Sequence, residues 1–299
     1  MGSEMCIRDS YSPSVLYLLI LVYNTIPKLI TGCNGFIGKK FAEKHQPFIG
    51  MEDFNCWAML EFFKGWEDID EIIHMGAISS TTETNEEALN SYNVEFSIRL
   101  FEKAIEHGIP VKYASSASVY GNRTDGGLDP LNLYAKSKVA VDLWVSENID
   151  RFDLIQGFRF FNVYGLGEEH KGNQRSPVSK FAEQAVQNGV IEIFEGSENC
   201  KRDFIWVDDV VVVVDNNGAG SGIYDLGSGH VYSFRQVAEI IAEKFGAEIK
   251  EIPFPEHLKD KYQYNTFSNF KWDQKEFVSI ETYISHLSLL DKNQTQSVS

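Results

Sequence analysis

The sequence has few cysteines, which excludes a disulfide-rich scaffold. Its 299 residues contain four of them, with no CxxC pair and no paired spacing. They stand at Cys6, Cys33, Cys56 and Cys200. Scattered thiols are typical of a reducing compartment, where they act as small apolar side chains. We therefore expect a cytoplasmic protein.

The sequence also lacks residues spaced as metal ligands, and it has fewer basic than acidic residues. His74, His107 and His170 have no second ligand nearby at metal spacing, so we predict no metal site. Lysine and arginine together number 27 against 43 acidic residues, a formal net charge of −16. Such acidity argues against a nucleic-acid partner, whose phosphates would be repelled. A small anionic ligand held by a local basic cluster stays compatible.

No apolar run near the amino terminus is long enough for a membrane span. Residues 15–22 are apolar, but this run is far too short to cross a bilayer, and no convincing cleavage site for a signal peptide follows it. We interpret residues 1–27 as a non-native or disordered leader and expect no membrane association. At this length, with 43% hydrophobic residues, the chain can bury the core of one large domain or two smaller ones.

Strand and helix patterns alternate from residue 28 to about residue 165. Apolar strands fit residues 28–31, 47–52, 71–80, 110–116 and 154–165. Helical patterns fit residues 36–45, 56–66, 86–108 and 133–149. This alternation predicts an α/β fold with a doubly wound parallel sheet covered by helices on both faces.

Beyond Gly165 the pattern is looser. A polar loop at 166–177 precedes a helix at 178–189, strand-like runs at 191–210, a strand at 221–229 and a helix at 233–246 with Ser233 as its cap. Residues 210–220 are rich in β-branched valine. We predict a smaller substrate-binding region over residues 166–290, interleaved with the first domain, and a disordered tail at 291–299.

Three glycines mark a nucleotide-binding turn. Gly32, Gly35 and Gly38 stand between the first strand and a helix, where a pyrophosphate can approach the helix N-terminus. Glu52 follows Gly32 by twenty positions, where a carboxylate would bind an adenosine ribose. Glu52 and Asp53 favour NAD over NADP by local charge, although Lys39 and Lys40 could still reach a phosphate.

Ser116, Tyr134 and Lys138 form the second candidate constellation. Tyr134 and Lys138 face the same side of a helix, and Ser116 ends a strand at the sheet edge where ligands bind. A phenol ionises near pH ~10, and a lysine cation with a nicotinamide ring would lower its pKa. The three could take a proton from a hydroxyl as hydride leaves its carbon. The alternative is a capped helix with a buried tyrosine.

Three motifs carry a family resemblance. With "TGCNGFIG", "SSASVYG" and "YAKSK" the chain resembles the extended short-chain dehydrogenase/reductases, which have a Rossmann-like fold and bind NAD(P). The resemblance implies Ser116, Tyr134 and Lys138 as the catalytic triad, because Ser116 stands four residues before Tyr120. For the cofactor we expect contacts from Gly32, Gly35, Phe36, Ile37, Gly38, Glu52, Asp53, Met75, Gly76, Ala77, Ser79, Asn93, Lys138 and Val163.

Further segments narrow the resemblance. "GAISSTTE", "FRFFNVYG", "EEHKG", "EGSENCKRDF", "DLGSG" and "IPFPEHLKDKYQ" are similar to the ADP-glyceromanno-heptose 6-epimerases of lipopolysaccharide core biosynthesis. This implies an isomerase that epimerises a sugar nucleotide through a keto intermediate, with Lys171 as a further catalytic group. It also favours NADP. The implied substrate-binding residues are Asn162, Lys171, Asn173, Lys180, Phe194, Glu195, Gly196, Ser197, Arg202 and Tyr262.

Other readings stay open. A UDP-sugar 4-epimerase or a sugar-nucleotide dehydratase would share the same triad, and a nucleotide-sensing protein without turnover would share the glycine turn. The segment between Gly38 and residue 71 is short, so we expect one strand and one helix of the usual fold to be missing. Lys180 stands where the family pattern has histidine. The sequence leaves a homo-oligomer open.

Overall fold

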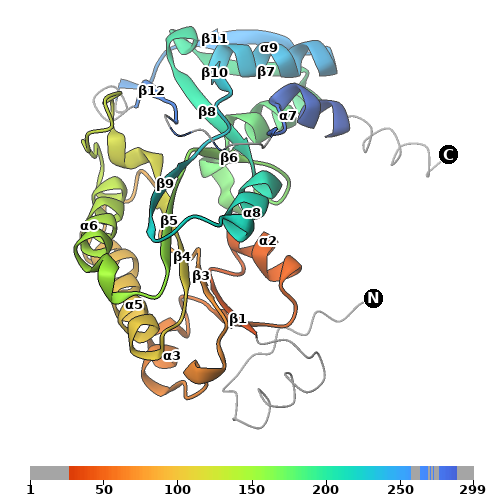
Figure 1. Cartoon of the computed structure of the whole chain (residues 1–299). Helices are drawn as coiled ribbons and strands as arrows, with labels where there is room; N and C mark the ends of the chain where they lie inside the picture. Colours follow the sequence, from red (N-terminus) through yellow and green to blue (C-terminus); the bar gives the residue numbers. More distant parts are fainter. Residues whose placement is uncertain (1–26, 257–262, 269, 271, 273–275, 288–299) are drawn as a thin grey trace, which may run out of the picture.

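The computed structural model describes residues 27–256, 263–268, 270, 272 and 276–287, with the backbone alone at Asn173. Its centre is a six-stranded sheet in which every neighbouring pair of strands is parallel (Figure 1). The strand order is β2 (Phe48–Met51), β1 (Lys28–Thr31), β3 (Ile72–His74), β4 (Val111–Ser116), β5 (Ile155–Phe160) and β9 (Gly222–Leu226). The predicted parallel α/β fold is confirmed.

Helices cover both faces of this sheet because successive strand residues point to opposite sides. Leu29 packs in the core with α3 (Cys56–Phe62), α5 (Phe96–His107) and α6 (Leu133–Asn148). Ile30, the next residue, packs with α2 (Phe36–Lys44) and α8 (Val207–Asn216). In Figure 1 these two groups of helices lie on opposite sides of the sheet.

The valine-rich run forms a helix, although its residues favour strands. In α8, Val207, Val210, Val211 and Val214 recur at helical spacing and are buried against the sheet. Asp208 and Asp209 in the first turn also suit a helix N-terminus. Burial of one apolar face therefore outweighs the weak preference of β-branched residues against helices.

Several expected elements are divided in the structure. Residues 154–165 form two strands, because β5 stays in the main sheet while β6 (Asn162–Tyr164) pairs with β8 (Lys201–Trp206). Residues 86–108 form α4 (Glu86–Leu89), the π-helical η2 (Asn90–Glu95) and α5, which ends at the left-handed Gly108 as expected. The polar loop contains the 3-10 helix η5 (Glu169–Gln174).

The segment between α2 and β3 is short and forms only a few elements. Between α2 and β3 the chain supplies β2, α3 and the 3-10 turn η1 (Trp66–Asp68). The strand β2 pairs directly with β1 and stands at the edge of the sheet. This direct pairing brings the end of β2 beside the glycine turn that follows β1.

A second group of elements stands over the carboxyl ends of the main sheet (Figure 1). Strands β10 (Val231–Ser233), β8 and β12 (Asn265–Thr266) form one four-stranded sheet together with β6, while β7 (Val190–Phe194) pairs with β11 (Glu248–Ile252). Helices α7 (Pro177–Asn188) and α9 (Phe234–Phe245) and helical residues 280–287 share a core with them. Ser233 caps α9 as expected. Because α8 and β9 return to the first sheet, the two regions interleave; the boundary at residue 165 stays a prediction.

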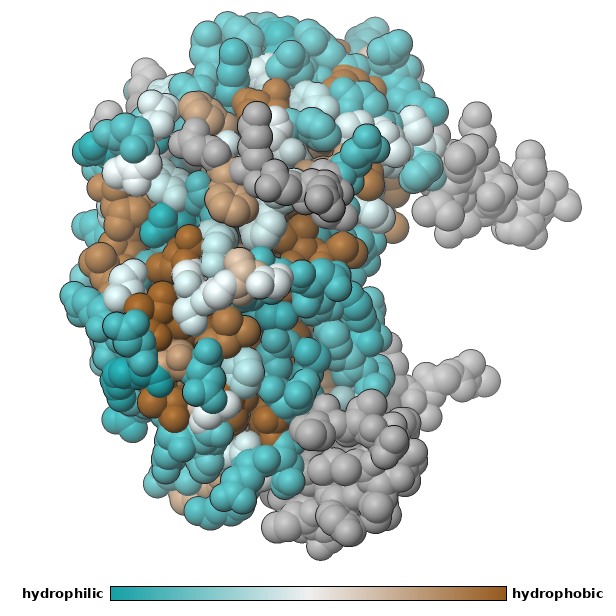
Figure 2. Space-filling model, viewed as in Figure 1, coloured by the Kyte–Doolittle hydropathy of each residue, from teal (hydrophilic) through white to brown (hydrophobic). Residues whose placement is uncertain are grey.

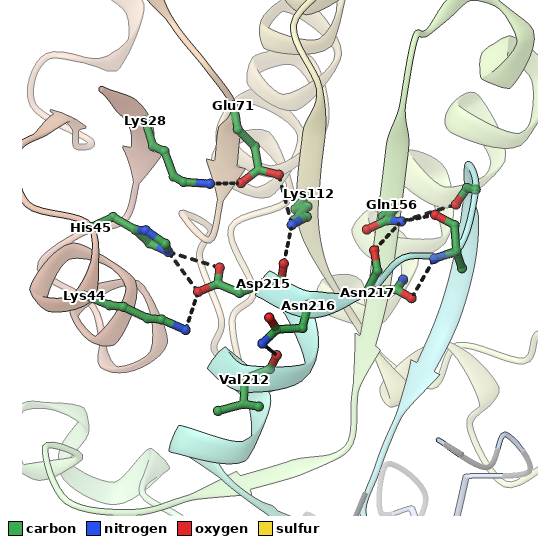
Figure 3. A network of polar contacts seen from close by, with 12 residues as sticks. Lys28, Lys44, His45, Glu71, Lys112, Gln156, Val212, Asp215, Asn216 and Asn217 are labelled. Atoms are coloured by element: carbon green, nitrogen blue, oxygen red, sulfur yellow. Dashed lines mark hydrogen bonds and ion pairs between the residues drawn. The ribbon is translucent and has the colours of Figure 1, made fainter. Parts of the chain in front are cut away.

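The amino ends of the central strands are tied by ion pairs (Figure 3). Glu71 binds Lys28 at 2.5 Å and Lys112 at 3.0 Å. Lys112 also donates to the backbone oxygen of Asp215 at 3.2 Å, and the Asp215 carboxylate binds Lys44 at 2.6 Å. These contacts link β1, β4, α2 and the end of α8 at the edge opposite the glycine turn.

Among the described helices, none has the length and apolar character needed to cross a bilayer. In the view of Figure 2, hydrophilic residues dominate the upper and lower ends of the molecule, and hydrophobic residues gather in patches across the middle. Within the described residues, no cluster of histidine, cysteine or carboxylate side chains could hold a metal ion.

Candidate functional site

The glycine turn after β1 is closed by contacts that leave no room for side chains. Gly32 has a φ of +64°, and a Cβ there would lie 2.6 Å from the Cα of Gly76. A Cβ on Gly38 would lie 2.0 Å from the carbonyl oxygen of Gly32. Helix α2 begins after Gly35, whose N-cap position carries no side-chain cap. Free N–H groups at such a helix end favour a phosphate.

Glu52 lies beside this turn, at the end of β2. Its Oε1 accepts a hydrogen bond from the backbone N–H of Asn34 at 2.7 Å. Asn34 is part of the turn between Gly32 and Gly35, so the carboxylate stands next to the expected phosphate cradle. The residues therefore fit a dinucleotide: the turn for the pyrophosphate and Glu52 for a ribose hydroxyl.

A cavity of about 1240 Å³ opens above the carboxyl ends of the strands. Drug-sized ligands occupy sites of ~300–1,000 Å³, so this one is large enough for a dinucleotide together with part of a second ligand. Of the predicted cofactor residues, the cavity is lined by Gly32, Gly35, Phe36, Ile37, Gly38, Glu52, Asp53, Met75, Gly76, Ala77, Ser79, Lys138 and Val163. The predicted catalytic residues Ser116, Tyr134, Lys138 and Lys171 line it as well.

Ser116, Tyr134 and Lys138 meet as the sequence predicts. Ser116 ends β4, and its side chain hydrogen-bonds that of Tyr134. Tyr134 stands in the first turn of α6, which Asn132 caps by accepting from the N–H of Ala135 at 2.8 Å. One turn later, the Lys138 Nζ lies 5.9 Å from the centre of the Tyr134 ring and donates to the Ala114 carbonyl at 2.8 Å.

Burial governs the protonation of this pair. Burial raises the pKa of Tyr134, and the hydrogen bond with Ser116 opposes it only in part. Burial lowers the pKa of Lys138 to about 8, while the Asp142 carboxylate acts in the other direction. In the protein alone, desolvation of the charged form thus outweighs the neighbouring polar groups. The lowering of the phenol pKa expected with a nicotinamide ring in place stays a prediction.

Lys171 faces the same cavity from η5. Its Nζ lies 5.2 Å from the centre of the Phe36 ring and 3.9 Å from Glu168 Oε2. Glu168 is buried and accepts from the backbone N–H groups of Gly165 at 3.2 Å and Ser176 at 2.6 Å, which fixes the loop. Burial lowers the pKa of Lys171 in spite of Glu168. A lysine with a lowered pKa can exchange a proton more readily near neutral pH.

Besides Lys171, two predicted substrate residues line the cavity. Arg202 is 5% exposed, stacks over the Phe234 ring at 5.2 Å and donates to the Tyr264 carbonyl at 2.8 Å. Asn162, at the start of β6, donates to the Asp203 carbonyl at 3.1 Å. Both side chains are thus fixed by backbone groups while bordering the cavity.

Other predicted residues lie outside the cavity wall. Asn93 is buried behind it, donating to Ser137 Oγ and the Ile78 carbonyl at 3.0 Å, so it supports the wall without lining it. Phe194 packs edge-on against Phe254 at 5.5 Å. Four further predicted substrate residues do not line the cavity: Lys180, Glu195, Gly196 and Ser197. Asn173 is described by its backbone alone, and Tyr262 lies outside the described residues.

The cavity also includes polar residues that the sequence patterns did not single out. Arg175 lines the cavity and pairs with Glu183 at 2.5 Å. Gln263 reaches the cavity and donates to the Gly121 carbonyl at 2.6 Å. His170 and Gln174 flank Lys171 there. Of these residues, His170 and Gln263 belong to segments that carry the family resemblance, "EEHKG" and "IPFPEHLKDKYQ".

The chain matches the model of the NAD dependent epimerase/dehydratase family over residues 51–218. The chain belongs to this family. It is therefore an NAD-dependent enzyme of the epimerase/dehydratase class, compatible with NAD or NADP. The glycine turn, Glu52 and the lysine–tyrosine pair, which line one cavity, stay its predicted cofactor-binding and reaction site.

Solved structures share the fold. An ADP-L-glycero-D-manno-heptose-6-epimerase from Helicobacter pylori is 23% identical with a TM-score of 0.72, covering 89% of this chain and 96% of that one. A UDP-glucose 4-epimerase from Thermotoga maritima, in a structure with UDP-glucose, is 18% identical with a TM-score of 0.75, covering 88% and 99%. MoeE5, in complex with UDP-glucose and NAD, is 22% identical with a TM-score of 0.69, covering 88% and 99%. These identities support the fold and leave the substrate undecided.

Proposed function

We propose that this enzyme is a sugar-nucleotide epimerase, with ADP-glyceromanno-heptose as its substrate class and carbon 6 of the heptose as the reacting centre. The observation that carries the proposal is the convergence of Ser116, Tyr134, Lys138 and Lys171 on one cavity that also contains the glycine turn. A proton-transfer pair and a dinucleotide cradle in one space are what transient oxidation of a hydroxyl requires.

The residues divide the proposed reaction between them. A bound nicotinamide would supply the hydride acceptor and later the donor. Tyr134 takes the hydroxyl proton of the substrate, Ser116 holds the same oxygen, and Lys138 stabilises the phenolate that accepts the proton. The substrate becomes a ketone, turns within the cavity, and receives hydride on its other face. Its oxygen then regains a proton, so there is no net oxidation.

Two orientations of the ketone need two proton donors unless its oxygen returns to one place. Lys171 lines the cavity from the polar loop and has a lowered pKa. We therefore assign it the proton transfer in the second orientation. The rival role is electrostatic, since a lysine cation can also hold a diphosphate oxygen.

The cationic residues of the cavity favour a diphosphate ligand within an acidic chain. Arg202 and Lys171 border the cavity. The pKa of Lys180 is lowered by burial and by nearby Arg175 and Lys171, so these three cations stand close together. Arginine binds phosphate in a bidentate manner. We expect a cytoplasmic enzyme whose product serves lipopolysaccharide core assembly. The heptose assignment is supported by the "EGSENCKRDF" and "HKG" segments together with the Helicobacter fold neighbour.

A panel of substrates tests the proposal. The full-length protein is incubated with each ADP-heptose epimer and with UDP-glucose, and the products are identified by NMR. Interconversion of the ADP-heptose epimers supports the proposal. Conversion of UDP-glucose to its 4-epimer, or loss of water from either substrate, would replace it with a 4-epimerase or a dehydratase. Absence of turnover with tight nucleotide binding would favour a sensing protein.

A further inference from the structure

Behind the proton-transfer pair lies a buried carboxylate that the proposed mechanism does not use. Tyr134, Lys138 and Asp142 follow one another at intervals of four along α6, and all three are buried. Asp142 is 1% exposed. Its Oδ1 accepts from the hydroxyl of Tyr113 at 3.0 Å, and its Oδ2 accepts from the hydroxyl of Ser115 at 3.0 Å.

Arg159 completes the coordination of this carboxylate. Its Nε donates to Asp142 Oδ2 at 2.8 Å, and its Nη1 donates to the hydroxyl of Tyr120 at 2.7 Å. Tyr120 in turn donates to Asp225 Oδ1 at 2.5 Å. The network therefore joins α6 to β4, β5 and β9, and each hydrogen bond has a defined direction.

Lys138 stands between this network and Tyr134. Its Nζ donates to a neutral carbonyl, that of Ala114, and no ion pair of Lys138 is seen within the described residues. The charged group that acts on it is Asp142, on its own helix, and Arg159 from β5 meets Asp142. The titratable groups beside Lys138 are Tyr134 on α6 and His74 on β3, while Tyr113 on β4 contacts Asp142. Burial and Lys138 lower the pKa of His74 to about 3, so His74 is neutral.

We propose that Asp142 is a positioning residue that keeps Lys138 charged and holds Ser115, next to Ser116, in its place at the end of β4. A carboxylate one turn behind a desolvated lysine favours the ammonium form. The Arg159 guanidinium fixes the carboxylate and limits its field, because it neutralises one side of it. The inference rests on the proposed roles of Tyr134 and Lys138.

The Asp142 carboxylate acts to raise the pKa of both Lys138 and Tyr134. Without it, the lysine loses its proton at lower pH and the phenol ionises at lower pH. Both limbs of a bell-shaped pH profile therefore move in the same direction, towards acid, in Asp142→Asn. A purely structural defect would reduce turnover at every pH without moving both limbs.

The test reads the protonation of Lys138 directly. The full chain is labelled with carbon-13 at the lysine ε carbon, the Lys138 signal is assigned from its loss in Lys138→Met, and its titration is followed by NMR. From a wild-type midpoint of about 8, we expect a lower midpoint in Asp142→Asn. We expect turnover at pH 8 to fall by roughly fivefold, as the charged fraction of the lysine falls. An unmoved midpoint would overturn the inference.

Two further variants keep the test decisive. Arg159→Met removes the cation that offsets Asp142, so the Lys138 midpoint should rise, opposite to the effect of Asp142→Asn. This variant decides the question if Asp142→Asn does not fold, and a fall of the midpoint would contradict the inference. Glu147→Gln removes the same charge from the exposed face of α6 and should leave the midpoint unchanged. Failure of the proposed function is distinguishable, because the wild type would then not interconvert the ADP-heptose epimers, whereas the NMR titration of Lys138 would still report the effect of Asp142.

Discussion

Two buried lysines at opposite ends of the central sheet have different surroundings. Lys112 and Lys138 are each 6% exposed. At the amino end, Lys112 binds Glu71 at 3.0 Å and a backbone oxygen of Asp215 (Figure 3). At the carboxyl end, Lys138 donates to the Ala114 carbonyl and has no ion pair in the described part of the chain. The two lysines are thus equally buried, but among the described residues the charge of Lys112 is compensated by a carboxylate in an ion pair and that of Lys138 is not.

The difference separates charges that stabilise from charges that react. A buried pair holds its partners in one protonation state, which suits a structural role. A buried lysine without a carboxylate partner has a pKa near its working pH, and such perturbed groups cluster at functional sites. Lys138 and Lys171, both with lowered pKa, lie at the carboxyl end, where open α/β sheets bind ligands.

The largest expected effect is on turnover, from the lysine without an ion pair. We predict that Lys138→Met reduces kcat by about 10²–10⁴-fold, because the phenolate loses its stabilising cation. The free energy of unfolding should stay the same or increase, since a desolvated charge is replaced by an apolar side chain of similar length. Steady-state kinetics measure kcat, and urea denaturation measures the free energy of unfolding. A loss of stability with preserved kcat would show that Lys138 has a structural role and not a catalytic one.

Tyr134→Phe and Lys171→Met should each lower turnover by orders of magnitude, with weaker effects on substrate binding. With aldehyde analogues of the two epimeric series, we expect each variant to fail mainly on one orientation of the carbonyl. The matched control is Lys136→Met, since Lys136 is an exposed lysine of α6 that does not line the cavity. If Lys171→Met raises KM and preserves kcat, Lys171 is a diphosphate clamp and the second proton transfer belongs elsewhere.

Lys112→Met should affect stability without affecting the reaction. It breaks a buried ion pair and leaves Glu71 with Lys28 as its remaining partner, so we expect a loss of about 2–3 kcal/mol in the free energy of unfolding, less than for a pair left wholly uncompensated. Urea denaturation measures it. Lys103→Met, which breaks the exposed pair with Glu106, should cause no measurable change. A fall in kcat for Lys112→Met would contradict the contrast between the two ends of the sheet.

The smallest predicted effect concerns cofactor choice. Glu52 stands beside the glycine turn, where its carboxylate would repel the 2′-phosphate of NADP. We predict tighter binding of NAD than of NADP, and a shift of roughly tenfold towards NADP in Glu52→Ala, worth about 1.4 kcal/mol. Dissociation constants from calorimetry check it. Tighter NADP binding by the wild type would show that Lys39 or Lys40 outweighs the carboxylate.

Local patterns predicted much of the first region. The glycine turn, the strand that ends at Ser116 and the helix with Tyr134 and Lys138 follow from spacing within a few residues. The contacts around them do not. Asp142 meets Arg159 only when α6 covers β5, and Gln263 reaches the cavity through a strand pairing far along the chain.

Two features depend on how the elements pack rather than on local pattern. The valines of α8 favour a strand locally and form a helix because one face is buried against the sheet. Asn93 was expected to touch the cofactor, yet its side chain bonds Ser137 and Ile78 behind the cavity wall. Periodicity indicates which residues turn inward, but it does not say which layer of the interior they reach.

Tracing the hydride tests the central claim most directly. The sugar nucleotide that turns over is prepared with deuterium on the reacting carbon and incubated with the enzyme in ordinary water, and the product is examined by NMR and mass spectrometry. Transient oxidation followed by return of the same hydride predicts that the epimerised product retains the deuterium on that carbon, with no net change in absorbance at ~340 nm. Loss of the deuterium to solvent would contradict this account, since the inversion would then proceed by proton exchange at carbon.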